Sequence, residues 1–564
     1  MLPVQANRTS IPGLYDAAPN PPEPELVYVS RTCAADVDKF GEVGLTGRSR
    51  TPLTRRTRPP PPEPAVPRAA SLDPRTPVVV AVGQVDQRVD DPADALEPTA
   101  LLAEAARTAA ADAGAPGLLD ALDTIAVIHI LSWRYRDPGA AVAAALGIAP
   151  ARTIETDDGG NYPQTLLNRA CLEIQDGRAD AVLIGGAETW RTRSRTRAAG
   201  TEPNWTVQPE GVVPTERIAA AEPLGHPGEW ARRVMMPVEI YPLFENALRA
   251  RHGWTIDEHR DRLGRLWSGF SEVAAANPHA WIRRAYTPEE VREASPENRM
   301  VCFPYTKVMN ANNSVEQAAC FVVCSVERAR ALGVSPDRWV FPWAGTDAHE
   351  HWYVSHRHDL SEAPAIRIAG RRALALAGVD VDDLAHVDVY SCFPSAVQIA
   401  AEELGLGTHR PLTVTGGLSF AGGPWNDYVS HSIATMVERL REDAGSLGLV
   451  TANGGFLTKH AFGVYSTTPP TVPFVHEDLQ AQVDPLPRRD LAEEVDGPVT
   501  VETSTVAHGR DGRPERAIVA AVLPDGRRAW GNATDADAMD RFLAEETHGA
   551  AGRIDPEGTF AFTG

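Results

Sequence analysis

Residues 157–188, DDGGNYPQTLLNRACLEIQDGRADAVLIGGAE, join a helical pattern to a buried strand. An amphipathic segment follows Gly160 and runs to Glu173, and a polar turn comes after it. The run Ala181–Ile184 is short and apolar and is followed by glycines, which is typical of a fully buried strand. We therefore expect a helix that starts at a glycine-rich turn and packs against the strand that follows it.

The same alternation of strand and helix extends over most of the chain. Strand candidates lie at 78–83, 124–130, 181–184, 319–323, 387–390 and 448–451, and helical patterns lie at 97–113, 365–377, 395–404 and 429–440. Alternating elements of this kind predict an α/β layered fold. Because the order of elements after Trp343 resembles that of the first half, we interpret the chain as an internal duplication.

With 564 residues the chain is too long for a single hydrophobic core, so we expect several domains. Residues 1–74 are rich in proline and poor in apolar residues, which predicts disorder. We place the first core half at 75–342, with a mostly helical insertion at about 192–296 that is suited to a lid or substrate tunnel. The second half spans 343–484, and a small β domain spans 485–564.

Composition excludes several classes of protein. The formal net charge of −21 is spread along the chain, which favours solubility and disfavours nucleic acid as a partner. The six cysteines show no CxxC pair and no zinc-ligand spacing, so we expect reduced core thiols and no metal site. No apolar run reaches the roughly 20 residues of a membrane span, and no signal peptide is recognisable. We expect a cytoplasmic protein without a membrane partner.

The C-terminal segment combines strand patterns with an acidic balance. The hairpin signal Asp525-Gly526 lies between runs of alternating and β-branched residues, and a helical pattern at 536–546 closes the segment. Residues 499–564 contain seven Lys and Arg against eleven Asp and Glu, a net charge of −4. A surface that follows phosphates has the opposite sign, so this domain is not expected to bind nucleic acid.

Four motifs between residues 77 and 470 resemble those of the thiolase superfamily. In thiolases, a helix and strand at the spacing seen here begin with a reactive cysteine, and Gly160 stands in its place. The run MNANNSVEQAA at 309–319 is similar to the family's Asn-rich turn before a central strand. A simple turn with an N-cap is the alternative for this second motif.

The third motif is VYSCF at 389–393, which resembles the Asn-Glu-Ala-Phe motif of thiolases and the His-Asp-Cys-Phe motif of sterol carrier protein thiolases. The first residue of those motifs helps to polarise the thioester oxygen, and Tyr390 takes that position. Its hydroxyl can donate to an oxyanion or exchange a proton. The alternative is a packed ring with a satisfied hydroxyl. Cys392 matches the sterol carrier pattern, and we expect it to be buried rather than reactive.

The fourth motif, GGLSFAGGP at 416–424, is similar to the family's Gly-Gly-x-x-x-x-Gly-His-Pro loop. Its glycines allow the backbone to approach a thioester closely, which implies binding roles for Gly416, Gly417, Gly422 and Gly423. The family's histidine activates the cysteine, and Gly423 replaces it. Both members of the nucleophile pair are therefore absent together, which indicates a changed chemistry or none.

A further run, TANGGF at 451–456, resembles the loop that presents the second, acid/base cysteine of thiolases. Asn453 replaces that cysteine and can still form a hydrogen bond. Downstream, His460 follows a glycine-rich turn that we expect to be mobile, and it is a candidate general acid/base because its ordinary pKa lies near neutral pH. A surface or capping role is the alternative for His460.

Coenzyme A requires cations for its phosphates and donors for its thioester. Arg191 and Arg193 are the candidates for phosphate contact, together with Arg195 and Arg197, although a solvated loop explains the same pattern. Gly160 and Asn161 lie at the start of the predicted helix, where free N–H groups and the helix dipole favour a thioester oxygen. The resemblance also led us to expect room beside Gly160.

The resemblance is closest to thiolase-like proteins type 1. It implies a duplicated five-layer αβαβα core, a helical insertion and a small β-barrel-like C-terminal domain. We expect an acyl-CoA-binding protein of lipid metabolism, nominally an acyltransferase, without covalent cysteine catalysis. Thiolase-like steroid side-chain aldolases suggest carbon–carbon bond chemistry on a CoA thioester, with Tyr390, His460 and Asn453 as candidate catalytic residues.

A non-catalytic acyl-CoA binding or scaffolding protein is the alternative to an enzyme. In both cases we expect coenzyme A as part of the substrate or ligand rather than as a permanently bound cofactor. Thiolases usually pair through the core, which makes a homodimer an expectation here as well.

Overall fold

The computed structural model describes residues 72–563, except 220–221 and 408–409. The prediction of disorder for residues 1–74 concerns residues that, apart from 72–74, lie outside this range. In the described residues, the elements form two sheets of the core and a third sheet near the C-terminus. Within the same range, no helix has both the length and the apolar character needed to cross a membrane.

The first core sheet has six strands in the order β1-β8-β4-β2-β3-β5. Its strands are β1 (Pro77–Asp86), β2 (Thr124–Val127), β3 (Arg152–Glu155), β4 (Ala181–Glu188), β5 (Glu216–Arg217) and β8 (Gln317–Ser325). All nine residues of β8 are buried, and the strand runs antiparallel to both β1 and β4. This burial on both faces explains the near-continuous apolar pattern of the segment.

The second core sheet has the order β10-β11-β12-β9-β13. Its strands are β9 (Phe341–His349), β10 (His386–Asp388), β11 (Leu447–Gly454), β12 (Lys459–Ser466) and β13 (Val475–Asp478). The strands β1, β2, β4 and β8 of the first sheet have counterparts in β9, β10, β11 and β12. The predicted internal duplication is therefore confirmed.

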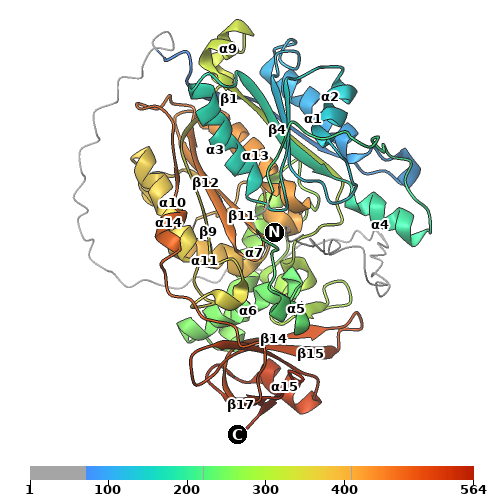
Figure 1. Cartoon of the computed structure of the whole chain (residues 1–564), viewed down its shortest axis with the longest axis vertical. Helices are drawn as coiled ribbons and strands as arrows, with labels where there is room; N and C mark the ends of the chain where they lie inside the picture. The colour runs from blue at the N-terminus through green and yellow to red at the C-terminus, as the bar shows by residue number, and fades with distance from the viewer. Residues whose placement is uncertain (1–71, 220–221, 408–409, 564) are drawn as a thin grey trace, which may run out of the picture. The chain divides into compact units, whose positions relative to one another are not determined.

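Helices cover both sheets and fill the space between them. They are α1 (Pro98–Ala113), α2 (Pro138–Leu146), α3 (Tyr162–Gln175), α9 (Val326–Ala331), α10 (Pro364–Ala377), α11 (Pro394–Leu404), α12 (Gly417–Phe420), α13 (Tyr428–Glu442) and α14 (Gln480–Val483). The helices α3 and α13 contact strands of both sheets, whereas α1 and α2 pack mainly on strands of the first sheet and α10 mainly on strands of the second (Figure 1). The result is the predicted five-layer αβαβα core.

The insertion is mostly helical, as predicted. It contains α4 (Trp190–Ala198), α5 (Pro227–Ala231), α6 (Pro237–His252), α7 (Ile256–Ala276) and α8 (Pro288–Arg292). The helix α6 contacts α11 of the core and β14 of the C-terminal sheet. The helix α6 therefore lies between the core and the C-terminal strands, where it can bring side chains to the ends of the core strands.

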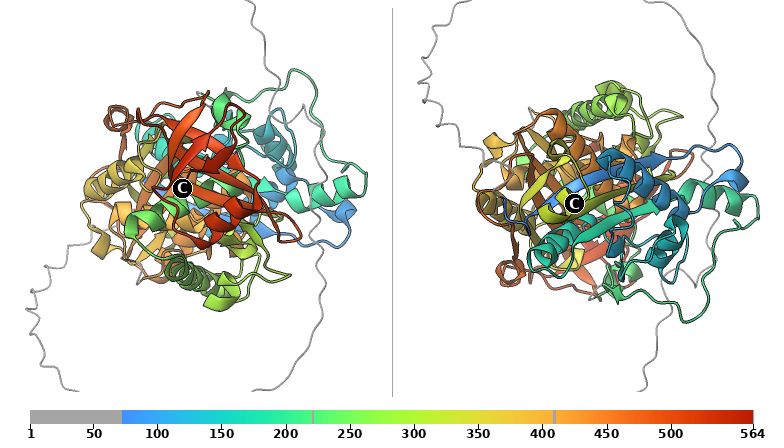
Figure 2. Two further views of the ribbon diagram at one scale, coloured as in Figure 1. Left: turned by 90° about the horizontal axis from the view of Figure 1, so that it is seen from below. Right: turned by 90° about the horizontal axis from the view of Figure 1, so that it is seen from above.

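The C-terminal strands form a sheet with the order β16-β15-β14-β17-β18 (Figure 2, left). Its elements are β14 (Gly497–His508), β15 (Pro514–Val522), β16 (Arg528–Ala533), α15 (Ala536–Ala544), β17 (Ala551–Ile554) and β18 (Phe560–Phe562). A bridge between Asn532 and Thr559 joins the two outer strands, which gives the predicted barrel-like closure. The short strand β6 (Met300–Cys302) pairs with β14 and β7 (Tyr305–Thr306), so the segment after the insertion extends this sheet.

A buried carboxylate fixes the second core half. Asp388, at the end of β10, is fully buried, and burial raises the pKa of its carboxyl group. One oxygen accepts hydrogen bonds from the backbone of Val414 and Thr415 at 2.9 and 3.2 Å. The other accepts from the hydroxyls of Tyr428 and Ser432 at 3.1 and 2.6 Å. Asp388 therefore joins β10 to the turn before Gly416 and to α13.

Asp388→Ala is expected to lower the free energy of unfolding by about 3–5 kcal/mol, because several buried donors lose their acceptor at once. Urea denaturation followed by circular dichroism measures the change. The exposed Asp382→Ala is the matched control and should stay within about 0.5 kcal/mol of the parent protein. Equal effects of the two substitutions would contradict the anchoring role of Asp388.

Candidate functional site

The N-terminus of α3 lies directly against two other parts of the core. A Cβ atom at Gly160 would lie 2.5 Å from the hydroxyl oxygen of Tyr390 and 2.6 Å from the carbonyl oxygen of Asn453. Real Cβ atoms do not approach other atoms this closely, so only glycine fits at this position. The expected room beside Gly160 is therefore absent, because the Tyr390 hydroxyl and a backbone carbonyl occupy it.

Free donors surround this contact. In the described part of the chain, neither the backbone N–H of Gly160 nor that of Asn161 donates a hydrogen bond to a protein acceptor. The preceding residue, Gly159, donates its N–H to the side chain of Asn426 at 2.9 Å. Two unpaired N–H groups at a helix N-terminus form a site that favours an oxygen with partial negative charge.

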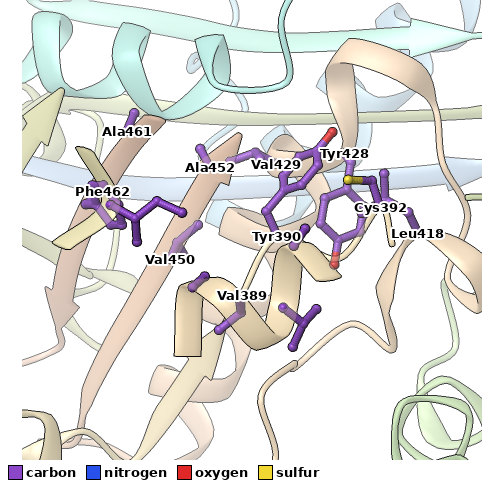
Figure 3. Close-up of a cluster of buried hydrophobic side chains, with 14 of the residues drawn as sticks. Val389, Tyr390, Cys392, Leu418, Tyr428, Val429, Val450, Ala452, Ala461 and Phe462 are labelled. Atoms are coloured by element: carbon purple, nitrogen blue, oxygen red, sulfur yellow. The ribbon is translucent and has the colours of Figure 1, made fainter. Parts of the chain in front are cut away.

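Tyr390 lies two residues beyond the end of β10, so the predicted strand at 387–390 ends earlier than expected. Its backbone N–H donates to the hydroxyl of Thr451 at 2.9 Å, and its ring meets that of Tyr428 edge-on with centroids 5.5 Å apart (Figure 3). Burial raises the pKa of Tyr390 well above its usual range. No hydrogen bond to its hydroxyl exists among the described residues, so this buried phenol keeps its proton and its donor stays available.

Asn453 is the last residue but one of β11 and lies beside this contact. Its side-chain amide donates to the hydroxyl of Tyr241 at 3.0 Å, and its buried Oδ1 has no partner among the described residues. The Tyr241 hydroxyl also accepts from the backbone of Leu457 at 2.9 Å and lies 3.1 Å from the carbonyl of Gly455. Tyr241 belongs to α6, and no local sequence pattern connects it with a turn more than 200 residues away. Sequence analysis therefore missed it.

His460 pairs with Asn453 across β11 and β12. Both residues line a cavity of about 10 Å³, together with Tyr390 and Thr451. Burial lowers the pKa of His460 to about 3, and its Nε2 has no partner in the described residues. The cavity has about the size that holds one water molecule. The glycine-rich turn before His460 leads straight into buried strand residues, and the imidazole is neutral at physiological pH.

Lys459 is a second residue that sequence analysis did not single out for a role. Its side chain is buried, and its ammonium group donates to the carbonyl of Asp158 just before the glycine turn. The rings of Tyr162 and Trp352 lie 4.9 and 5.8 Å from the ammonium nitrogen. Burial lowers its pKa, against the opposing charges of Asp157 and Asp158. Lys459 therefore tethers the α3 turn to β12.

The glycine loop contacts protein groups on all sides. Cβ atoms at Gly416 and Gly417 would meet Ala274 and Phe270 of α7 at 2.4 and 2.7 Å. A Cβ atom at Gly422 would meet the side chain of Gln317 at 2.0 Å, and one at Gly423 would meet the Oδ1 of Asn313 at 2.9 Å. These four glycines thus allow close packing, and their predicted contact with coenzyme A stays a prediction.

The predicted phosphate arginines make local contacts on α4. Arg191 donates to the carbonyl of Val89 at 3.0 Å and lies 3.6 Å from a carboxylate oxygen of Glu316. Arg193 pairs with Glu202 at 2.7 Å. These contacts do not place either guanidinium group beside Gly160. A role for Arg191 and Arg193 in binding phosphates remains a prediction.

The thiols offer no replacement nucleophile in the described residues. The five described cysteines are buried and form no disulfide. Cys392 is the thiol beside Tyr390 and Asn453, and burial raises its pKa to about 12. A thiol of this kind is almost fully protonated at neutral pH and is a weak nucleophile. Within the described range, no group of three or more His, Cys, Asp or Glu side chains is placed to hold a metal ion.

Comparison with known families matches two parts of the chain. Residues 346–410 match the thiolase C-terminal domain-like family, and residues 478–559 match the additional C-terminal domain of thiolase-like protein type 1. Among curated proteins, an acetyl-CoA acetyltransferase of Methanocaldococcus jannaschii is 23% identical over 267 residues, which is 47% of this chain. The chain spans 59% of the length of that relative.

Solved structures extend this likeness to most of the chain. A monomeric SCP2-thiolase-like protein type 1 from Mycobacterium smegmatis is 32% identical, with a TM-score of 0.75, and the match covers 87% of this chain and 100% of that chain. The Ltp2-ChsH2(DUF35) aldolase (19% identity, TM-score 0.53) matches 70% of this chain and 98% of its own. The dimeric peroxisomal thiolase of Saccharomyces cerevisiae (13%, 0.50) matches 71% and 99%. The aldolase and the yeast thiolase are similar to this chain in fold.

Gly160→Ala is expected to lower the free energy of unfolding by about 1–3 kcal/mol, because the added methyl group meets a carbonyl that belongs to a strand. Gly269→Ala is the matched control, since Gly269 is an exposed residue of α7 with open space around the Cβ position. The control should gain about 0.4–1 kcal/mol. Chemical denaturation measures the free energy of unfolding of both variants. An unchanged free energy of unfolding in Gly160→Ala would contradict the close contact.

The buried imidazole of His460 predicts a pH-dependent stability. Its pKa is lower in the folded protein than in the unfolded chain, so the unfolded state binds the extra proton first as the pH falls. Its contribution is complete above about pH 6.5 and is lost on acidification, with a loss of about 2 kcal/mol at pH 5.

His460→Asn removes this titrating group. The free energy of unfolding of the variant should therefore fall less between pH 7.5 and pH 5 than that of the parent protein. Urea titrations at several pH values measure both slopes, and parallel curves would show that His460 does not titrate in this way.

Proposed function

This chain belongs to the SCP2-thiolase-like type 1 proteins of the thiolase superfamily, and from that premise we propose that it binds an acyl-CoA thioester and acts on it without a cysteine nucleophile. The observation that carries the proposal is the Tyr390 hydroxyl beside the free N-terminus of α3, at the position where a side chain on Gly160 would begin. Three donors without protein acceptors in the described structure then lie near one another: this hydroxyl and the N–H groups of Gly160 and Asn161.

Such an arrangement suits the carbonyl oxygen of a thioester. The oxygen gains negative charge when the thioester becomes an enolate, and preorganised donors stabilise that charge most strongly in a water-poor site. The raised pKa of Tyr390 keeps the phenol protonated, so it donates a hydrogen bond at neutral pH. The dipole of α3 adds a partial positive charge at the same place.

The proposed reaction is cleavage or formation of a carbon–carbon bond next to the thioester. In cleavage of a 3-hydroxyacyl-CoA, the hydroxyl proton passes to a base and the bond between C2 and C3 breaks. Its electron pair moves onto the thioester oxygen as an enolate, and C2 takes up a proton. The products are a carbonyl compound and a shorter acyl-CoA. His460 is the candidate base, because its Nε2 has no protein partner in the described residues and it lines the same cavity as Tyr390.

A second candidate is acyl-CoA binding without turnover. It is favoured by the small volume beside Tyr390, which has about the size of one water molecule and leaves no space for the thioester to react at this point. The insertion helices α6 and α7 contact the same region through Tyr241 and Phe270. Turnover at Tyr390 then requires these helices to move, whereas a scaffolding role does not require such a movement.

We propose a soluble protein that acts alone or as a homodimer.

Tyr390→Phe is expected to lower turnover of a 3-hydroxyacyl-CoA by about 100-fold or more, because the transition state loses a donor and the fold keeps its ring. The assay follows release of aldehyde or ketone and of the shorter acyl-CoA. Binding of coenzyme A, measured by calorimetry, should change little. Tyr353→Phe is the control, since Tyr353 bonds to Glu222 outside the site.

Each result of this assay has a distinct meaning. Binding of every thioester without turnover favours the scaffold. Full activity in Tyr390→Phe removes Tyr390 from the chemistry. A stable acyl adduct on Cys392, detected by mass spectrometry, would overturn the cysteine-free mechanism.

A further inference from the structure

A second cavity, of about 180 Å³, lies on the segment between β9 and α10. Ionisable side chains line most of it, among them Glu350, Arg357, His358 and Arg367. Its volume is well above the roughly 10–15 Å³ that holds one water molecule. The segment that forms it reads HEHWYVSHRHD at 349–359, an unusual density of histidine and charge that the thiolase resemblance does not explain.

Two opposite charges meet in this cavity without pairing. Glu350 and Arg357 are each only 3% exposed, and no nitrogen of Arg357 lies within 4 Å of a Glu350 oxygen in the described structure. One Glu350 oxygen accepts from the backbone of Ala365 at 2.7 Å. Burial of a charge without an ion-pair partner costs free energy that hydrogen bonds to neutral groups offset only in part, so an anion beside Arg357 would stabilise this arrangement.

Arg357 has unused donors on the cavity side. Its Nη2 donates to the carbonyl of Phe456 at 2.5 Å and to the hydroxyl of Thr458 at 3.0 Å. Its buried Nε has no partner in the described residues. A guanidinium group forms a fork that matches the two oxygens of a carboxylate or phosphate. Because Nη2 already donates to two protein acceptors, Nε–H and Nη1 are the donors that remain for such a group.

The other charges around the cavity are already engaged. Asp359 accepts from the backbone and hydroxyl of Ser361 at 2.7 Å, and Glu362 lies 3.4 Å from Arg251. Arg367 pairs with Glu403 at 2.7 Å. Burial raises the pKa of Glu350 to about 7, so its carboxyl group carries a proton in much of the population at neutral pH and can donate. The groups that remain free are therefore donors.

We propose that this cavity binds a small oxyanion, a carboxylate or a phosphate, with Arg357 as its main partner and Glu350 and His358 as further donors. The site is distinct from the Tyr390 site and does not depend on the function proposed for that site. The oxyanion occupies the gap between Arg357 and Glu350 and accepts from the Nε–H and Nη1–H groups of Arg357, which have no protein acceptor in the described structure.

Binding of an anion in the cavity is also expected to make the turn between β11 and β12 more rigid. Arg357 holds this turn through Phe456 and Thr458, and the backbone N–H of Glu350 donates to the Thr458 carbonyl at 2.8 Å. An anion that fixes Arg357 therefore fixes residues 454–458. Slower amide hydrogen exchange in this turn is the expected structural signature of binding.

The test uses isothermal titration calorimetry of the full chain with inorganic phosphate and, separately, with acetate, against chloride at equal ionic strength. Saturable binding of either oxyanion, with slower exchange at 454–458, is the expected result. Arg357→Lys keeps the charge but loses the fork, and it should weaken binding at least about 10-fold. Arg372→Lys on the exposed side of α10 is the matched control and should bind like the parent protein.

Glu350→Gln provides a second test of the proposal, through the pH dependence of acetate binding, if Arg357→Lys does not fold. In the parent protein, acetate should bind more weakly at pH 8 than at pH 6, because the ionised Glu350 repels the anion. The charges that face Glu350 are Arg357, Arg367 and Glu403, and His351 and His358 lie beside it in the cavity. Glu350→Gln should remove most of the pH dependence while these other groups stay.

Three results would overturn the proposal. The first is a lack of saturable binding of both phosphate and acetate over chloride. The second is unchanged binding in a folded Arg357→Lys variant. The third is equal pH dependence in the parent protein and Glu350→Gln. Binding of only one of the two anions identifies which oxyanion the cavity accepts.

Discussion

The contact between Gly160 and the end of β11 constrains the whole candidate site. The nearest backbone atom to a Cβ at position 160 is the carbonyl oxygen of Asn453, whose position is set by a ladder of paired residues between β11 and β12. A backbone atom in a sheet cannot move aside as a flexible side chain can. The turn before α3 therefore requires glycine, and any reactive side chain at this position would need a different arrangement of β11.

Tyr390 completes this constraint from the other side. Its ring lies edge-on to Tyr428, whose hydroxyl in turn bonds to Asp388. Tyr241 reaches the same strand end from α6, and its hydroxyl bonds to Asn453 of β11 and to Gly455 and Leu457 of the turn that follows. Tyr390 and Tyr241, which come from different parts of the chain, thus both pack at the end of β11 beside the start of α3. The lack of a thiol at position 160 and the presence of the Tyr390 phenol beside it are therefore parts of one steric arrangement.

Much of the fold could be predicted from the sequence because its elements have strong local patterns. Buried strands such as β8 are continuous apolar runs, and helices such as α10 end at glycines with a left-handed backbone. The candidate site was harder to predict. Gly160, Tyr390 and Asn453 were singled out and do meet, but their meeting depends on long-range packing, and sequence patterns gave no sign that Tyr390 fills the space beside Gly160. Tyr241 and Arg357 act across more than 95 residues, so no local pattern identifies their partners.

The unpaired polar groups argue that the site is more than a remnant of lost catalysis. Asn453 Oδ1 and His460 Nε2 are buried without protein partners in the described structure, and both residues line the same small cavity as Tyr390. An unsatisfied buried polar group typically costs about 1–3 kcal/mol, so two of them lower the stability of a marginally stable fold substantially. Apolar side chains of similar shape would remove that cost. A site that retains these groups is stabilised when a ligand oxygen or a water molecule satisfies them, and free donors beside a helix N-terminus make a thioester oxygen a suitable partner.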